Sequence, residues 1–169
     1  MMITEDLIIV VQIVAACIQG FATIGILLTF IVYFLQLSTM QRQLEVSKSA
    51  ATSQNLIALV NFLQDEKTQD ARRVVIRILS SKAIANWTKE EERAAAKVCS
   101  TYDIAGISIR EGLIPSAPIV NNWGASIKKC YKILQPYIWE MKKRNGPSYW
   151  DDFGWLEGKA KDINSYDAD

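Results

Sequence analysis

The sequence predicts an all-α protein, with one N-terminal transmembrane helix that continues into a stalk, followed by a cytoplasmic bundle of about five helices. Two observations lead to this prediction. Residues 7–41 contain no Asp, Glu, Lys or Arg. Beyond them, apolar residues recur at helical spacing, with no convincing pair of strands and no internal repeat. We therefore expect two domains, the transmembrane helix in residues 1–41 and the cytoplasmic helical domain in residues 42–169.

The membrane span is expected at about residues 7–37, which are mostly Leu, Ile, Val, Ala and Phe. Crossing the hydrocarbon core takes roughly 20 apolar residues, so this segment is long enough. A cleaved signal peptide is one alternative, but the first six residues contain Glu5 and Asp6 and no basic residue, whereas signal peptides begin with basic residues. A buried helix of a soluble domain is the other, but such helices are usually shorter and have a polar face.

The charges predict the orientation of the span. All 19 Lys and Arg follow it, beginning with Arg42 and Lys48. Because basic residues accumulate on the cytoplasmic side of membrane proteins, we expect the N-terminus outside and residues 42–169 in the cytoplasm. The predicted location is the inner (cytoplasmic) membrane, and the lipid bilayer is the first predicted partner.

Several kinds of chemistry are excluded by composition. The chain has no histidine, so Ser-His-Asp and Cys-His catalysis and histidine-based zinc sites are ruled out. The three cysteines, Cys17, Cys99 and Cys130, have neither disulfide nor metal-site spacing. Cys99 and Cys130 occur in helical contexts, and we expect them to be small buried residues. The sequence predicts no enzyme and no catalytic, cofactor-binding or metal site.

The span is expected to continue into a stalk, because no Pro or Gly interrupts residues 37–51. Residues 54–64 then show an apolar stripe at helical spacing. A further helix is expected at about residues 67–80. The stripe in residues 54–64 comprises Leu56, Leu59, Val60 and Leu63. The apolar side of the helix at 67–80 comprises Ala71, Val74, Val75 and Ile78.

A capping box predicts the start of the next helix. Thr88 precedes Glu91 by three positions, so the side chain of each residue can accept a hydrogen bond from the backbone N–H of the other. This helix is expected to continue through Val98, Tyr102 and Ile109 and to stop near Gly112.

The following helix is expected to begin at Ser116 and Pro118, and Pro136 is expected to kink or break it. A segment at residues 137–144 and a last amphipathic helix at about residues 148–163 complete the bundle.

A set of motifs resembles a known family. In chain order they are Tyr102-Asp103-x-x-Gly106, Glu111-Gly112-Leu113-Ile114-Pro115, Trp123, Pro136, Arg144, and Tyr149 with Phe153. Over roughly residues 60–163 they resemble an uncharacterised bacterial family of short, N-terminally anchored helical proteins, classed as a domain of unknown function.

More remotely, the layout is similar to the membrane accessory protein of type VI-B CRISPR systems. That resemblance implies a HEPN-like helical domain on a transmembrane helix, assembly into a ring-shaped pore, and a role in antiviral defence. HEPN ribonucleases place a histidine a few residues after an arginine. The chain departs from this pattern at Arg72, Arg73, Arg77 and Arg110, so the resemblance implies only the scaffold or pore role.

One stripe of the span carries polar and small side chains. Gln12, Ala16, Gln19 and Thr23 lie on one helix face, and Gly20 forms a small-xxx-small pair with Ala16. An amide facing lipid is left unsatisfied, so such groups turn toward other helices or water. The sequence leaves three arrangements open: a dry homo-oligomer, an aqueous pore, or a heteromeric or monomeric state in which glutamines reach the interface.

A basic segment follows in the helical domain. Six positive charges fall within 17 residues, at Lys128, Lys129, Lys132, Lys142, Lys143 and Arg144. They form a possible contact surface for anionic lipid or RNA. The acidic residues after Ser148 offer the alternative that the two regions compensate each other.

We expect the chain to homo-oligomerise through its span and stalk and to act on the membrane, as a pore-forming or depolarising effector or accessory in antiphage defence. The defence role follows from the resemblance alone. The alternative is a membrane-tethered adaptor whose helical domain binds a cytoplasmic protein or RNA.

Overall fold

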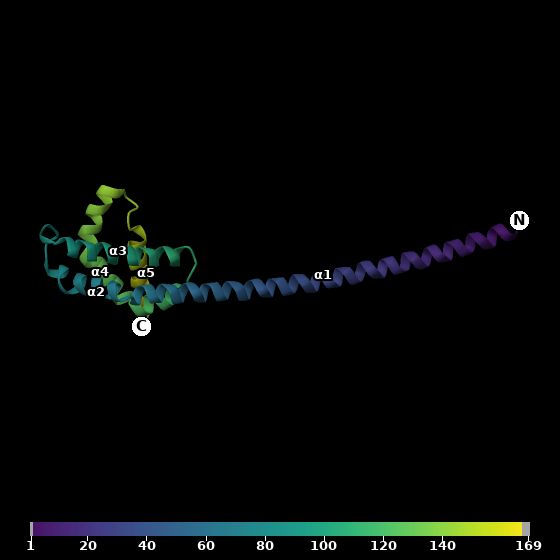
Figure 1. The fold of residues 1–169 in the computed structure, drawn as a ribbon, viewed down its shortest axis with the longest axis horizontal. Coiled ribbons are helices and arrows are strands. Elements are labelled where there is room, and N and C mark those ends of the chain that lie inside the picture. The colour runs from purple at the N-terminus through teal and green to yellow at the C-terminus, as the bar shows by residue number, and fades with distance from the viewer. Residues whose placement is uncertain (1, 167–169) are drawn as a thin grey trace. The chain divides into compact units, whose positions relative to one another are not determined.

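The computed structural model describes residues 2–166 and shows an all-helical chain with no β-strand in that range (Figure 1). Side chains are described from Val11 to Asp162, except those of Gln12, Ala15 and Ala22. The five α-helices are α1 (Met2–Gln64), α2 (Glu66–Arg77), α3 (Lys89–Arg110), α4 (Ser116–Asn145) and α5 (Asp151–Tyr166). The predicted all-α fold is confirmed.

The chain divides into two compact units, Met1–Ala50 and Ala51–Asp169. The second unit holds the hydrophobic core, in which α3 packs against α2, α4 and α5, and α4 also packs against α2 and α5. The predicted boundary after Gln41 marks the start of the charges rather than a change in packing. That the membrane domain ends at Gln41 remains a prediction.

The last turns of α1 belong to the core. Leu63 is fully buried and Leu59 nearly so, and Leu56 and Val60 pack against them, as the apolar stripe predicted. The helix ends at Gln64 because Asp65 adopts a non-helical conformation and caps α2, its carboxylate accepting a hydrogen bond from the Thr68 backbone N–H at 3.2 Å. The core bundle therefore consists of four complete helices and the end of α1.

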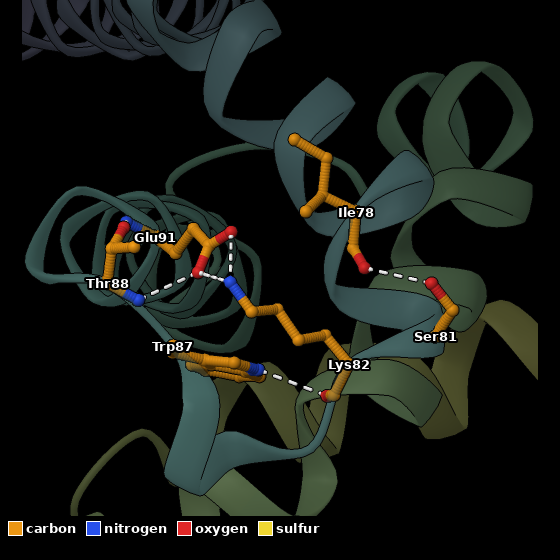
Figure 2. Close-up of polar contacts among 6 residues, drawn as sticks. All are labelled: Ile78, Ser81, Lys82, Trp87, Thr88 and Glu91. Carbon is orange, nitrogen blue, oxygen red and sulfur yellow. Dashed lines mark hydrogen bonds and ion pairs between the residues drawn. The ribbon is translucent and has the colours of Figure 1, made fainter.

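The connection between α2 and α3 is held by polar contacts (Figure 2). It contains two short 3-10 turns, Leu79–Ser81 and Ile84–Asn86, so the helix predicted to Ser80 ends at Arg77. The capping box is confirmed, since Thr88 Oγ1 accepts from the Glu91 N–H and the Glu91 carboxylate accepts from the Thr88 N–H.

Glu91 also forms an ion pair across this connection. Lys82 Nζ lies 2.7 Å from its carboxylate, and the indole N–H of Trp87 donates to the Lys82 carbonyl at 3.1 Å (Figure 2). The bond from Lys82 and that from the Thr88 backbone hold the pKa of Glu91 below its usual range. The capping box thus fixes both the first turn of α3 and the loop that leads into it.

The end of α3 agrees with the sequence. The helix stops at Arg110, and Gly112 takes a left-handed conformation with φ of 70°, which glycine adopts without steric cost. Val98, Tyr102 and Ile109 are buried, as the helical spacing predicted.

Of the two outcomes predicted at Pro136, a kink or a break, the break does not occur. α4 is continuous from Ser116 to Asn145. Proline removes one N–H, the donor to the carbonyl of Lys132, but both Lys132 and Pro136 are exposed, so water can satisfy that carbonyl. Leu134 and Tyr137 are buried on the other face and hold the two halves of the helix in the core.

The last helix starts at Asp151 rather than Ser148, because residues 147–150 form a turn in which Trp150 has φ of 58°. Its first turn is capped by a side chain from α3. Asp103 Oδ1 accepts a hydrogen bond from the Phe153 backbone N–H at 3.1 Å, across 50 positions of sequence. The motif around Asp103 therefore has a structural role, the docking of α5 on α3.

We expect replacement of Asp103 to separate the role of its oxygen from that of its charge. Burial, together with the neighbouring Asp152 charge, raises the pKa of Asp103, although the hydrogen bond from Phe153 opposes this shift. A raised pKa means that folding favours the protonated form. The stability that this carboxyl contributes is complete below the ordinary aspartate pKa of about 3.9 and is lost as pH rises through the higher value in the fold.

Asp103→Asn keeps an acceptor and removes the charge, so at pH 7 it should be at least as stable as the natural chain. Asp103→Ala should lose about 1 kcal/mol with the cap. Urea unfolding followed by tryptophan fluorescence at pH 4 and pH 7 measures both, because all five tryptophans lie in the second unit. An Asn variant that is clearly less stable than the natural chain at pH 7 would contradict this account.

Both cysteines of the core are buried, as predicted. Burial raises the pKa of Cys130 to about 11 and that of Cys99 well above its usual range. These thiols behave as small apolar groups within the core.

Candidate functional site

The first unit presents a long apolar helical surface. The large apolar side chains described between Val11 and Val46 are exposed, with accessible fractions from 52% at Val32 to 77% at Phe21. By length and composition, this is one helix that could cross a membrane. Side chains of this kind cost about 25 cal/mol per Å² when left in water. The surface therefore calls for an apolar surrounding such as lipid or other helices.

The predicted polar stripe lies on this helix. Ala16, Gln19, Gly20 and Thr23 are exposed, and the side chain of Gln12 lies outside the described residues. A Cβ built at Gly20 meets no atom within 4 Å, so the helix surface is open at this small residue. Another helix could approach closely there.

The threonine of the stripe needs no partner outside the helix. Thr23 Oγ1 donates to the Gln19 carbonyl at 2.8 Å, and Thr29 and Thr39 bond the carbonyl four positions earlier in the same way. The Thr23 hydroxyl donor is therefore satisfied within α1, and the place of Thr23 on an associating stripe stays a prediction. Among the stripe residues whose side chains are described, the other polar group is the amide of Gln19. No hydrogen bond of this amide is found within the described residues.

The basic segment lies entirely in α4, and its charges are satisfied unequally. Lys142 pairs with Asp151, so the compensation by the acidic C-terminal region occurs at one lysine. Lys143 Nζ lies 3.2 Å from the ring centroid of Trp139, a cation–π contact. Within the described residues no ion pair involves the other four, Lys128, Lys129, Lys132 and Arg144.

Two other acids of α5, Asp152 and Glu157, pair outside the basic segment. Arg110 Nη1 of α3 lies 2.8 Å from Asp152 Oδ1, an ion pair without hydrogen-bond alignment. Glu157 pairs with Lys161 of its own helix at 2.6 Å. Asp167 and Asp169 lie outside the described residues. Among the ion pairs found in the described part of the chain, the acidic region thus meets the basic segment at Lys142 alone.

A family model described as "Domain of unknown function (DUF4760)" matches residues 12–159. The chain belongs to this family. The DUF4760 match includes the apolar part of α1 as well as the bundle, so it begins well before the motifs that suggested the relationship. No curated protein and no solved structure matches the chain. The similarity to the type VI-B CRISPR accessory protein has no support from these comparisons.

The structure of this DUF4760 chain also assembles a polar site that the sequence did not predict. A hollow of about 340 Å³ lies between α2 and α4, and its polar and aromatic lining residues are Gln69, Arg72, Arg73, Arg77, Trp123 and Ser126. Spacing alone could have placed Gln69, Arg73 and Arg77 on one face of α2, because they are four residues apart. The residues of α4 could not have been added, because the sequence does not say which helices pair.

Proposed function

We propose that the chain is a single-pass membrane protein whose α1 crosses the cytoplasmic membrane with the N-terminus outside. The observation that carries this proposal is the exposed apolar surface of residues 11–46, which has no charge up to Gln41. The intrahelical bonds of Thr23, Thr29 and Thr39 support it, because they satisfy hydroxyl donors without water.

We further propose that copies of the chain associate through the stripe of Gln12, Ala16, Gln19, Gly20 and Thr23, and that the assembly acts on the membrane. The Gln19 amide supports this step, since a primary amide in hydrocarbon seeks a partner from another helix or from water. The small residues Ala16 and Gly20 support it as well, because two helices can approach closely where side chains are small. A dry helix pair and a water-filled pore both satisfy the amide, and they differ in conductance.

Membrane insertion is tested with the full chain carrying a C-terminal green fluorescent protein. The chain should stay in the membrane fraction after alkaline extraction, and the fusion should fluoresce, because the reporter matures in the cytoplasm. Recovery in the soluble fraction would overturn the proposal. A non-fluorescent fusion in the membrane would reverse only the orientation.

Self-association is tested with the double variant Gln12→Leu, Gln19→Leu in lipid bilayers. Interhelical amide bonds are worth about 0.6–2 kcal/mol each, so each loss should weaken association about three- to thirty-fold. Single-molecule photobleaching measures the copy number. Gln36→Leu is the matched control, because it removes the same amide from another face of α1 and should leave association unchanged. Equal effects of both changes would contradict the stripe.

Action on the membrane is tested separately, with a voltage-sensitive dye in cells expressing the natural chain or the double variant. Depolarisation by the natural chain alone supports a pore. Equal depolarisation by both chains, or none by either, would count against action on the membrane through the stripe. Replacing residues 7–37 by polyleucine then tests the adaptor alternative, which predicts retained activity.

A further inference from the structure

The hollow between α2 and α4 has an unusual charge balance. Three of its lining residues are arginines, and no carboxylate lines it. Arg73 pairs with Asp70 at 2.7 Å, but both side chains are more than half exposed, so water screens this pair strongly. No ion pair of Arg72 or Arg77 is found among the described residues. The hollow therefore carries positive charge that attracts an anion.

Arg72 is held in place and is incompletely satisfied. Its Nη2 donates to the Leu63 carbonyl at 2.8 Å, which fixes the guanidinium at the end of α1. Its Nη1 is buried and makes no well-aligned hydrogen bond within the described residues, although the Tyr102 hydroxyl lies near this guanidinium. Buried donors without partners are rare in folded proteins. An oxygen atom of a ligand entering the hollow would supply the missing acceptor.

The α4 side of the hollow adds a flat ring and a hydroxyl. Trp123 and Ser126 lie three residues apart on α4 and both line the hollow. The Ser126 hydroxyl is within 2.8 Å of the Tyr102 hydroxyl, so it is positioned by a buried group of α3. An indole surface stacks nucleic-acid bases, and guanidinium groups match the geometry of phosphate oxygens.

We propose that this hollow binds a nucleotide, with its phosphate on the arginines of α2 and its base against Trp123. The volume of about 340 Å³ lies within the range of sites for small ligands. This inference goes beyond the proposed function. It uses only residues of the second unit and does not depend on the placement of α1 in a membrane.

The test uses the full chain in nanodiscs of zwitterionic phosphatidylcholine and measures binding by calorimetry. The probes are adenosine 5′-monophosphate, inorganic phosphate and adenosine. The monophosphate should bind more tightly than either part alone. Failure of all three to saturate at millimolar concentration would overturn the proposal.

Variants assign the binding to the hollow. Arg77→Gln should weaken binding of the monophosphate about ten- to a hundred-fold, the effect expected for loss of a charged hydrogen bond. Arg77 is exposed, and no hydrogen bond or ion pair of its side chain is found in the described residues, so this variant should fold even if Arg72→Gln does not. Arg93→Gln is the matched control, because it removes an exposed arginine of α3 outside the hollow. An equal loss in Arg93→Gln would show that only net charge matters.

Trp123→Leu tests the position of the base. It should lower the affinity for the monophosphate to that for inorganic phosphate, and it should leave the affinity for inorganic phosphate unchanged. Vesicles containing phosphatidylglycerol test whether the phosphate comes from a lipid instead. Vesicle binding that depends on Arg77, without binding of the monophosphate, would replace the nucleotide by a lipid head group and overturn the proposal.

Discussion

A single methyl group at position 106 is expected to displace α5 from α3. A Cβ built on Gly106 would lie 2.3 Å from the carbonyl oxygen and 2.8 Å from the carbonyl carbon of Asp152. Both are backbone atoms, so no side-chain rotation relieves the clash. The start of α5 must move, and with it the hydrogen bond from Phe153 to Asp103 and the ion pair of Asp152 with Arg110.

Gly106→Ala should therefore lower the free energy of unfolding by about 1–3 kcal/mol or more, and Gly106→Val by more again. The total stability of a domain is only about 5–15 kcal/mol, so this is a large fraction. Urea unfolding of the full chain in detergent, followed by tryptophan fluorescence, measures the loss. The ordinary preference of a helix for alanine over glycine, about 1 kcal/mol, acts in the opposite direction.

Gly158→Ala is the matched control. This glycine lies in α5, and a Cβ built there meets no atom within 4 Å. The change should stabilise the chain by up to about 1 kcal/mol. If Gly106→Ala were as stable as Gly158→Ala, the close approach of α3 and α5 at this position would be wrong.

Loss of the Phe153 ring is expected to have a similarly large effect. Phe153 is fully buried, and its ring centroid lies 5.1 Å from that of Tyr102 and 5.1 Å from that of Tyr131. The ring thus joins α5 to both α3 and α4. Phe153→Ala leaves a cavity that these helices cannot easily close, and should cost about 3–5 kcal/mol.

Trp139→Ala provides the comparison, because Trp139 is 60% exposed and its ring contacts Lys143. This change removes a larger ring from the surface and should cost at most about 1 kcal/mol. The same unfolding measurement applies. Equal losses for the two variants would show that burial of Phe153 does not hold α5 in place.

The sequence predicted well those features that depend on near neighbours. The capping box of Thr88 and Glu91 lies within one turn of helix, and the stop at Gly112 depends on one backbone conformation. The apolar stripe that includes Leu59 and Leu63 follows from helical spacing alone. Each of these signals is local, so it is visible before the fold is known.

The features that sequence reasoning missed depend on packing between distant segments. Pro136 reads as a helix breaker, but the buried residues on either side of it keep α4 continuous. Asp103 gives no sign in the sequence that it caps a helix 50 positions later. The arginine hollow requires that α2 pack against α4, and this pairing is set by the whole core.

The burial of Cys99 and Cys130 makes the folded bundle unreactive toward thiol reagents, since a thiol must be both accessible and ionised to react. A cysteine introduced on the outer side of α4 could consequently carry a spectroscopic label once the exposed Cys17 of α1 is replaced, with Cys99 and Cys130 left in place. Slow labelling of the two buried thiols of the core would in turn report how often the helices of the bundle separate.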